Sequence, residues 1–263
     1  MVTQPIPLTP TQVRVLALCP LHYHFLQQKP TAQLEPAQAA VDEMVRQTIQ
    51  LLHATGGPAK LSLRACLARV SQHRSARQMV ERYYRRLEND WASMIASNET
   101  MALRISIAGV SLALEATVDR LDKTSDGGIL AILFRTEPGP VPTAAALRRD
   151  HALTIYHSLV AATYPLKRPV RLQELWLQAN ESVTIELSEE EYRRNLSDLR
   201  EAVVALARGE VMARPGLHCD VCPFKHHGCP VYAHEVDNPD PADEFDLPPP
   251  DGKMSPRKWI FKI

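Results

Sequence analysis

The sequence of 263 residues lacks several features that would identify a class of protein directly. It has no net charge, because 30 lysines and arginines balance 30 aspartates and glutamates, so overall charge points to no partner. No apolar run approaches the length of a transmembrane helix, and the N-terminus lacks the basic start of a secretory signal. We therefore expect an intracellular, cytoplasmic protein with no membrane partner.

What is present is the composition of a folded domain. Apolar residues make up 45% and charged residues 23% of the chain, which is long enough to bury a sizeable core. The charge is unevenly distributed: residues 64–86 contain seven arginines and one acid, whereas residues 234–251 contain seven acids and no lysine or arginine. We expect one domain over residues 1–232, followed by a disordered tail rich in proline and aspartate over residues 233–263.

The N-terminal part of the chain predicts helices. Thr9 followed by Pro10 is typical of a helix start, and Pro20 is expected to end or kink that helix. A second helix is predicted over about residues 36–54, where two glycines follow. Helical spacing of apolar residues continues through a segment of about residues 60–95, inserted before the sheet.

The central part of the chain predicts a sheet. Apolar and polar residues alternate from residue 101 to 136, which indicates three strands with turns at residues 108–109 and 125–128. A helix over residues 144–165 and two further strands follow, and Ser188 begins a long amphipathic helix. This order predicts an α/β fold with a mixed central β-sheet flanked by helices.

Cysteine is scarce, yet three of the five cysteines lie in HCDVCPFKHHGCP, residues 218–230, at C-x2-C-x6-C spacing. In a reducing compartment such a cluster favours a metal or redox site over disulfides. Cys19 lies near the N-terminus and, like two of the clustered cysteines, is followed by proline. Four thiolates can hold zinc or a 4Fe-4S cluster, which would staple the N- and C-terminal segments together. The four predicted ligands are Cys19, Cys219, Cys222 and Cys229.

Other interpretations of the cysteines stay open on the residues alone. His218, His226 and His227 allow a mixed Cys/His zinc site. Zinc sites usually have two C-x2-C pairs, and this sequence has only one. The cysteines could also be unrelated buried residues, which is the interpretation that we favour for Cys66 on an apolar helix face.

The whole layout resembles the PD-(D/E)XK nuclease superfamily, in its RecB-type branch that carries an iron–sulfur cluster. The resemblance rests on the frame TPTQVRVLALCPLHYHF and CDVCPFKHHGCPVY, with VDRLD at residues 118–122, LFRT at 133–136 and DHALTIYHSLV at 150–160 between them. It covers roughly residues 9–232. It implies a restriction-endonuclease-like fold, DNA as partner, and a role in DNA repair or in a helicase–nuclease complex.

Departures from the family pattern decide what the resemblance implies for catalysis. In the family, two carboxylates bind Mg²⁺ or Mn²⁺ and a lysine orients or activates the attacking water. Asp119 matches the first carboxylate, but Leu133 stands at the second position and Arg135 at the lysine position. Leucine offers no oxygen to a hard cation, and a guanidinium stays protonated. We therefore expect an inactive nuclease fold in which Asp119 is a structural carboxylate paired with Arg120 or Arg135.

The alternative is an active Mg²⁺- or Mn²⁺-dependent nuclease with a displaced second carboxylate. Glu115, Glu137 and Asp122 are the candidates for that position, and Glu115 would share a strand face with Asp119. This alternative requires metal-dependent DNA cleavage that is lost in an Asp119→Ala variant.

DNA binding is predicted from the arginine-rich helical segment, whose guanidinium groups are expected to contact phosphates in a salt-dependent way. The same helix could equally present them as a solvated face. A third hypothesis is a zinc-stabilised protein without a nucleic-acid role. The predicted DNA contacts are Arg74, Arg77, Arg82, Arg85 and Arg86.

Overall fold

The computed structural model of the chain describes residues 4–28, 36–226, 228–232 and 259–262. Its central element is a six-stranded mixed sheet in the order β1-β3-β4-β5-β6, with β2 paired to the other edge of β3. The β1–β3 and β4–β5 pairs are parallel, and the other three pairs are antiparallel. The strands are β1 (Ile6–Leu8), β2 (Met94–Ile107), β3 (Val110–Lys123), β4 (Ile129–Arg135), β5 (Val170–Trp176) and β6 (Glu181–Glu186).

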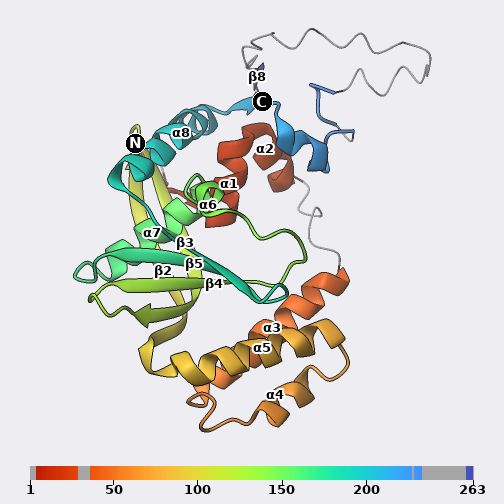
Figure 1. Cartoon of the computed structure of the whole chain (residues 1–263). Coiled ribbons are helices and arrows are strands. Elements are labelled where there is room, and N and C mark those ends of the chain that lie inside the picture. Colours follow the sequence, from red (N-terminus) through yellow and green to blue (C-terminus); the bar gives the residue numbers. More distant parts are fainter. Residues whose placement is uncertain (1–3, 29–35, 227, 233–258, 263) are drawn as a thin grey trace.

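Helices cover both faces of this sheet, as Figure 1 shows, with α3 to α5 on one side and α1, α7 and α8 on the other. This arrangement confirms the predicted fold class, a mixed α/β sheet flanked by helices. The helices are α1 (Pro10–Leu18), α2 (Pro20–Gln28), α3 (Pro36–Ala54), α4 (Leu63–Arg69), α5 (Arg74–Asp90), η1 (Trp91–Ser93), α6 (Ala144–Leu147), α7 (His151–Thr163), α8 (Glu189–Ala207) and η2 (Leu217–Val221).

Strand β4 separates the two cores of the domain. Its side chains alternate, so that Ala131 and Leu133 pack with α1, α7 and α8, while Ile132 and Phe134 pack with α3 to α5. All four are at most 5% exposed. Because both faces are covered, β4 has the nearly continuous apolar sequence of a buried strand.

Two local predictions can be followed to their physical cause. The Thr9 side chain accepts a hydrogen bond from the Gln12 backbone N–H, and the Gln12 side chain accepts one from the Thr9 backbone N–H, so a capping box begins α1 directly after β1. The turn between β2 and β3 places Ala108 and Gly109 at positive φ of 52° and 83°. Two such residues in succession match the right-handed twist of a two-residue hairpin.

A smaller unit lies at the end of the domain near α2. Strand β7 (Glu210–Ala213) pairs with β8 (Trp259–Lys262), and the buried Val211 and Ala213 of β7 pack with Cys19 and Leu21. Residues 233–258 of the predicted tail lie outside the described residues, so the predicted domain division stays a prediction. Among the described helices, none is long and apolar enough to span a membrane.

The core beneath α3 predicts a pH effect on stability. His53 is 6% exposed and its Nε2 lies 2.7 Å from the Tyr83 hydroxyl. Burial, aided by the charge of Arg120, lowers the pKa of His53 to about 4. The unfolded chain therefore binds a proton below pH 6.5 that the folded chain does not, so stability is lost as the pH falls.

We expect the free energy of unfolding to decrease by about 2 kcal/mol between pH 7.5 and pH 5 because of His53. Urea titrations at several pH values measure this, and a His53→Gln variant should lose that part of the pH dependence. Identical pH profiles for the two proteins would show that His53 is not the cause.

Candidate functional site

Asp119 lies where the sheet forks. Strand β3 pairs with β4 only from Arg120 to Lys123, so Asp119 is the first residue beyond that ladder. Strand β4 continues beside β5 instead, and the Phe134 N–H donates a 2.7 Å hydrogen bond to Asp119 Oδ2 across the fork. The carboxylate is thereby fixed by a backbone group.

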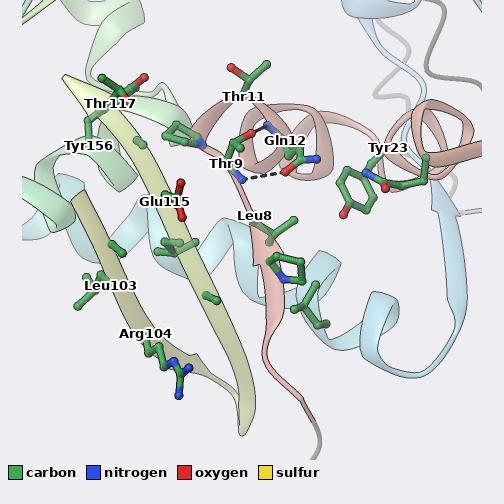
Figure 2. Close-up of a pocket in the computed structure, with 18 residues that line it drawn as sticks. Leu8, Thr9, Thr11, Gln12, Tyr23, Leu103, Arg104, Glu115, Thr117 and Tyr156 are labelled. Atoms are coloured by element: carbon green, nitrogen blue, oxygen red, sulfur yellow. Dashed lines mark hydrogen bonds between the residues drawn. The ribbon is translucent and has the colours of Figure 1, made fainter. Parts of the chain in front are cut away.

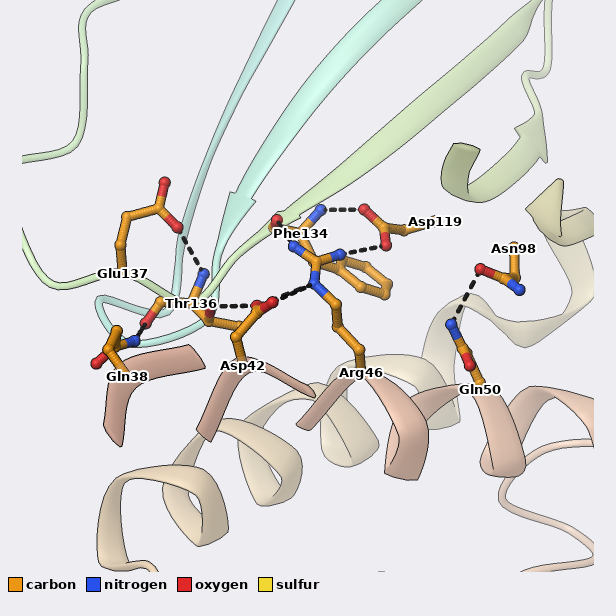
Figure 3. A network of polar contacts seen from close by, with 9 residues as sticks. All are labelled: Gln38, Asp42, Arg46, Gln50, Asn98, Asp119, Phe134, Thr136 and Glu137. Atoms are coloured by element: carbon orange, nitrogen blue, oxygen red, sulfur yellow. Dashed lines mark hydrogen bonds and ion pairs between the residues drawn. The ribbon is translucent and has the colours of Figure 1, made fainter. Parts of the chain in front are cut away.

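The other oxygen of Asp119 is bound by an arginine that the sequence did not reveal. Arg46 Nη1 lies 2.5 Å from Asp119 Oδ1, and Arg46 Nη2 donates to the Phe134 carbonyl oxygen at 2.8 Å. Arg46 Nε donates to the Asp42 carboxylate, 2.9 Å from Oδ1, one turn earlier on α3 (Figure 3). Asp42 also accepts a hydrogen bond from the Thr136 hydroxyl. Two carboxylates and one carbonyl thus surround one guanidinium.

The electrostatics of this cluster reflect partial burial. The side chains of Asp119 and Arg46 are 15% and 27% exposed. Burial raises the pKa of the Asp119 carboxyl, against the opposing effect of Arg46 and the Phe134 N–H. Burial alone would lower the pKa of Arg46, but Asp119 and Asp42 outweigh it and raise that pKa. Both shifts reflect a carboxylate and a guanidinium that share one partly buried site.

At the two positions where the family motif is altered, Leu133 is buried in the core and Arg135 is paired with Glu174. Leu133 is 2% exposed and belongs to the core on the α7 side. Arg135 Nε donates to Glu174 Oε1 at 2.9 Å, and the Glu174 side chain on β5 is only 3% exposed. Burial would lower the pKa of Arg135, but the Glu174 carboxylate raises it. Asp119 therefore pairs with Arg46, whereas sequence reasoning expected Arg120 or Arg135.

None of the three carboxylates considered as replacements is placed beside Asp119. Glu115 is exposed and stands four residues earlier on β3, which corresponds to about 13 Å along a strand. Asp122 is bound to the buried Arg120, with 2.6 Å between Oδ2 and Nη2. Glu137 accepts a hydrogen bond from the Thr136 N–H at 3.1 Å.

Glu115 instead lines an open groove of about 1160 Å³ between the β2–β3 hairpin and the segment from β1 to α1 (Figure 2). Arg104 and Tyr156 line the same groove. Burial raises the pKa of Tyr156, and the charge of Arg135 opposes that rise.

The five cysteines lie in two separate places. One narrow cavity is lined by all four candidate ligands together with His22 and His218, while Cys66 is buried in the core beneath α3 to α5. All five are free thiols. The Cys222 sulfur lies 3.9 Å from His22 Nδ1, and the Cys219 sulfur lies 3.8 Å from His218 Nε2.

The thiols of this cavity influence one another. Burial raises the pKa of Cys222 and Cys229, and the neighbouring cysteines add to the rise. A positive charge between the sulfurs would reverse that effect. In the part of the chain that the structure describes, no three His, Cys, Asp or Glu side chains stand close enough to hold a metal ion. His226 is exposed, and His227 lies outside the described residues.

The five arginines predicted to contact DNA all lie on α5 but differ in their partners. Arg82 donates to the Gln178 carbonyl oxygen, Arg85 pairs with Glu81, and Arg86 lies 3.8 Å from Asp90. Arg74 and Arg77 are exposed, and neither guanidinium has a hydrogen-bonded or ionic partner among the described residues. These two guanidinium groups are available to an external anion.

Comparison with known proteins places this geometry in context. A family model described as the PD-(D/E)XK nuclease superfamily matches residues 7–229, which include Asp119, Leu133, Arg135 and the four clustered cysteines. No curated protein matches the sequence. A solved structure titled "Crystal structure of SSO0001" is similar at 14% identity with a TM-score of 0.45, over 88% of this chain and 89% of that chain.

Proposed function

The chain belongs to the PD-(D/E)XK nuclease superfamily, and we propose that it is a non-cleaving member that binds DNA or serves as a scaffold in a DNA repair complex. One observation carries the proposal. Asp119, which matches the family's first metal ligand, is bound by Arg46 and Phe134, and the position of the second ligand is occupied by the buried Leu133. Nucleases of this superfamily typically use Mg²⁺ or Mn²⁺ to polarise the phosphate and activate water.

The residues present do not fit such a metal site. A divalent cation needs several oxygen ligands around it, and the oxygens nearest to Asp119 are already hydrogen-bonded to a guanidinium. Arg135, at the lysine position, is always protonated and is held by Glu174. These residues therefore argue against metal-dependent hydrolysis.

DNA binding is supported by the exposed Arg74 and Arg77 on α5. We expect an Arg74→Ala/Arg77→Ala variant to bind DNA more weakly and to lower the slope of log K against log salt by about 1.5, since each lost phosphate contact removes 0.7 to 0.9. Fluorescence anisotropy with labelled single- and double-stranded DNA, over a series of salt concentrations, measures both effects.

The matched control is an Arg193→Ala/Arg194→Ala variant, which removes the same charge from the exposed face of α8. It should leave the slope unchanged. Equal effects of the two double variants would mean that net charge, and not a surface on α5, determines binding. Wild-type chain that fails to bind DNA at low salt would leave only the scaffold role.

The cysteine cavity supports a second part of the proposal, an iron–sulfur cluster of the RecB type. Cys19, Cys219, Cys222 and Cys229 line one cavity, and four thiolates are the ligand set of a 4Fe-4S cluster. When bound, the cluster would link the start of α2 to the segment after β7 and supply stability that these short elements lack. The free thiols also support a reducing compartment such as the cytoplasm.

Zinc is the alternative metal for this cavity, and His22 or His218 could then replace a thiolate. Iron, sulfide and zinc analysis of protein purified without oxygen separates the two. A protein partner in a helicase–nuclease complex is compatible with a non-cleaving fold, because such a domain can bind DNA for another subunit.

A further inference from the structure

We infer that the Arg46 guanidinium takes the place of the divalent cation, so that the site is assembled around a cation from the chain itself. The inference rests on the proposed function, because it identifies the group that balances the charge of Asp119 in a site without a catalytic metal. It also assigns Arg46 the role of positioning Asp42, Asp119 and the Phe134 carbonyl. The substitutions at Leu133 and Arg135 alone do not indicate this role.

The first support is the set of groups around Arg46. Its three nitrogens are directed at the Asp119 carboxylate, the Asp42 carboxylate and the Phe134 carbonyl. Carboxylate and carbonyl oxygens are the ligands that Mg²⁺ and Mn²⁺ bind in proteins. The guanidinium thus occupies a position whose neighbours are all suited to a hard cation (Figure 3).

The second support is that each of these oxygen-bearing groups is also held by something other than Arg46. The Phe134 N–H fixes Asp119 from β4, and the Thr136 hydroxyl fixes Asp42 from the end of the same strand. The Phe134 carbonyl is part of the β4 backbone itself. Removal of the guanidinium would therefore leave oxygens that are already placed, which lowers the reorganisation needed to bind another cation.

The third support is the charge of the cluster. Without Arg46, the carboxylates of Asp42 and Asp119 would stand in one partly buried site with no cation between them. A guanidinium neutralises one of them, stays protonated at every physiological pH, and does not depend on metal supply. The same side chain also links α3 to strands β3 and β4 of the sheet.

Two consequences follow for metal binding. Wild-type chain should not bind Mn²⁺ at Asp119, because the guanidinium occupies the position. An Arg46→Ala variant should gain one Mn²⁺ site per chain, formed by the oxygens that Arg46 leaves. An Arg46→Lys variant keeps a cation on the same helix turn and should resemble wild type.

The test is Mn²⁺ titration of the full-length, cluster-loaded chain, followed by electron paramagnetic resonance of free Mn²⁺ and by calorimetry. We expect Arg46→Ala to bind Mn²⁺ at least tenfold more tightly than wild type, and the gain to be lost in Arg46→Ala/Asp119→Asn. Wild-type binding that Asp119→Asn abolishes would overturn the inference. A folded Arg46→Ala chain that binds no more Mn²⁺ than wild type would also overturn it.

If Arg46→Ala does not fold, Arg46→Met retains the apolar stem of the side chain and carries the same expectation. DNA incubated with the same samples separates this inference from the proposed function. Wild-type chain that binds Mn²⁺ at Asp119 without cutting DNA contradicts only the inference. Wild-type chain that cuts DNA with Mn²⁺ contradicts the proposed function.

Discussion

With the proposed 4Fe-4S cluster in the cysteine cavity, we expect a Cys222→Ser variant purified without oxygen to lack the brown colour and nearly all of the iron of the wild-type chain. Wild type should contain about four irons and four sulfides per chain if the cavity holds a 4Fe-4S cluster. Cys222 lines that cavity with three other cysteines, and serine is a poor ligand for iron–sulfur clusters. Absorption spectra and iron and sulfide analysis of both proteins measure the effect.

The same variant should be much less stable. The cluster would cross-link residues about 200 positions apart, and a cross-link that closes a loop of this length contributes on the order of 5 kcal/mol by chain entropy. Cys66→Ser is the control, because Cys66 lies in the other core and should keep full iron content. A wild-type chain that carries zinc, or no metal, would contradict the cluster assignment.

An Asp119→Ala variant will be destabilised by about 3 kcal/mol, which is the lower end of the cost of breaking a buried ion pair. The substitution removes the acceptor of both Arg46 and the Phe134 N–H. In a site built to hold a metal, carboxylates repel one another when the metal is absent, so removing one would stabilise the metal-free chain. The sign of the change therefore distinguishes an ion-pair site from a metal site.

Denaturant titrations in the presence of EDTA measure this change. Glu115→Ala is the matched control, since Glu115 is an exposed carboxylate on the same strand and should change stability by less than about 0.5 kcal/mol. An Asp119→Ala chain as stable as wild type, or more stable, would show that the contact with Arg46 does not support the fold.

Much of the fold could be predicted because it depends on local signals. The turn at Ala108 and Gly109, the caps at Thr9 and Ser188, and the change from helical to alternating spacing are each encoded within a few residues. The superfamily could be recognised for the same reason, because its motifs are short and lie in order along the chain.

The parts that sequence reasoning missed depend on contacts between distant segments. Strand β1 has three residues and pairs with β3 about a hundred residues later, so no local pattern marks it. The predicted helix over 144–165 divides into α6 and α7, because Asp150 accepts a hydrogen bond from the Ala152 N–H and begins a new helix.

The site itself shows the same limit. Asp42 and Arg46 form a pair four residues apart on one helix, which in most sequences is an unremarkable surface pair. Nothing local indicates that Arg46 reaches Asp119, 73 residues later. Glu174 was missed because a single acid in a strand gives no hint of its partner. Its burial is itself a signal to search for a cation, because an unpaired buried carboxylate would be costly.

A cleavage assay of the chain, purified without oxygen so that the cysteine site stays intact, shows whether Asp119 serves as a metal ligand. Single- and double-stranded DNA would be incubated with Mg²⁺, Mn²⁺ or EDTA, beside an Asp119→Asn variant. We predict that the DNA stays intact in every sample while it is bound in a salt-dependent way. Metal-dependent cleavage that Asp119→Asn abolishes would contradict the account, because Asp119 would then be a metal ligand despite its contacts with Arg46 and Phe134.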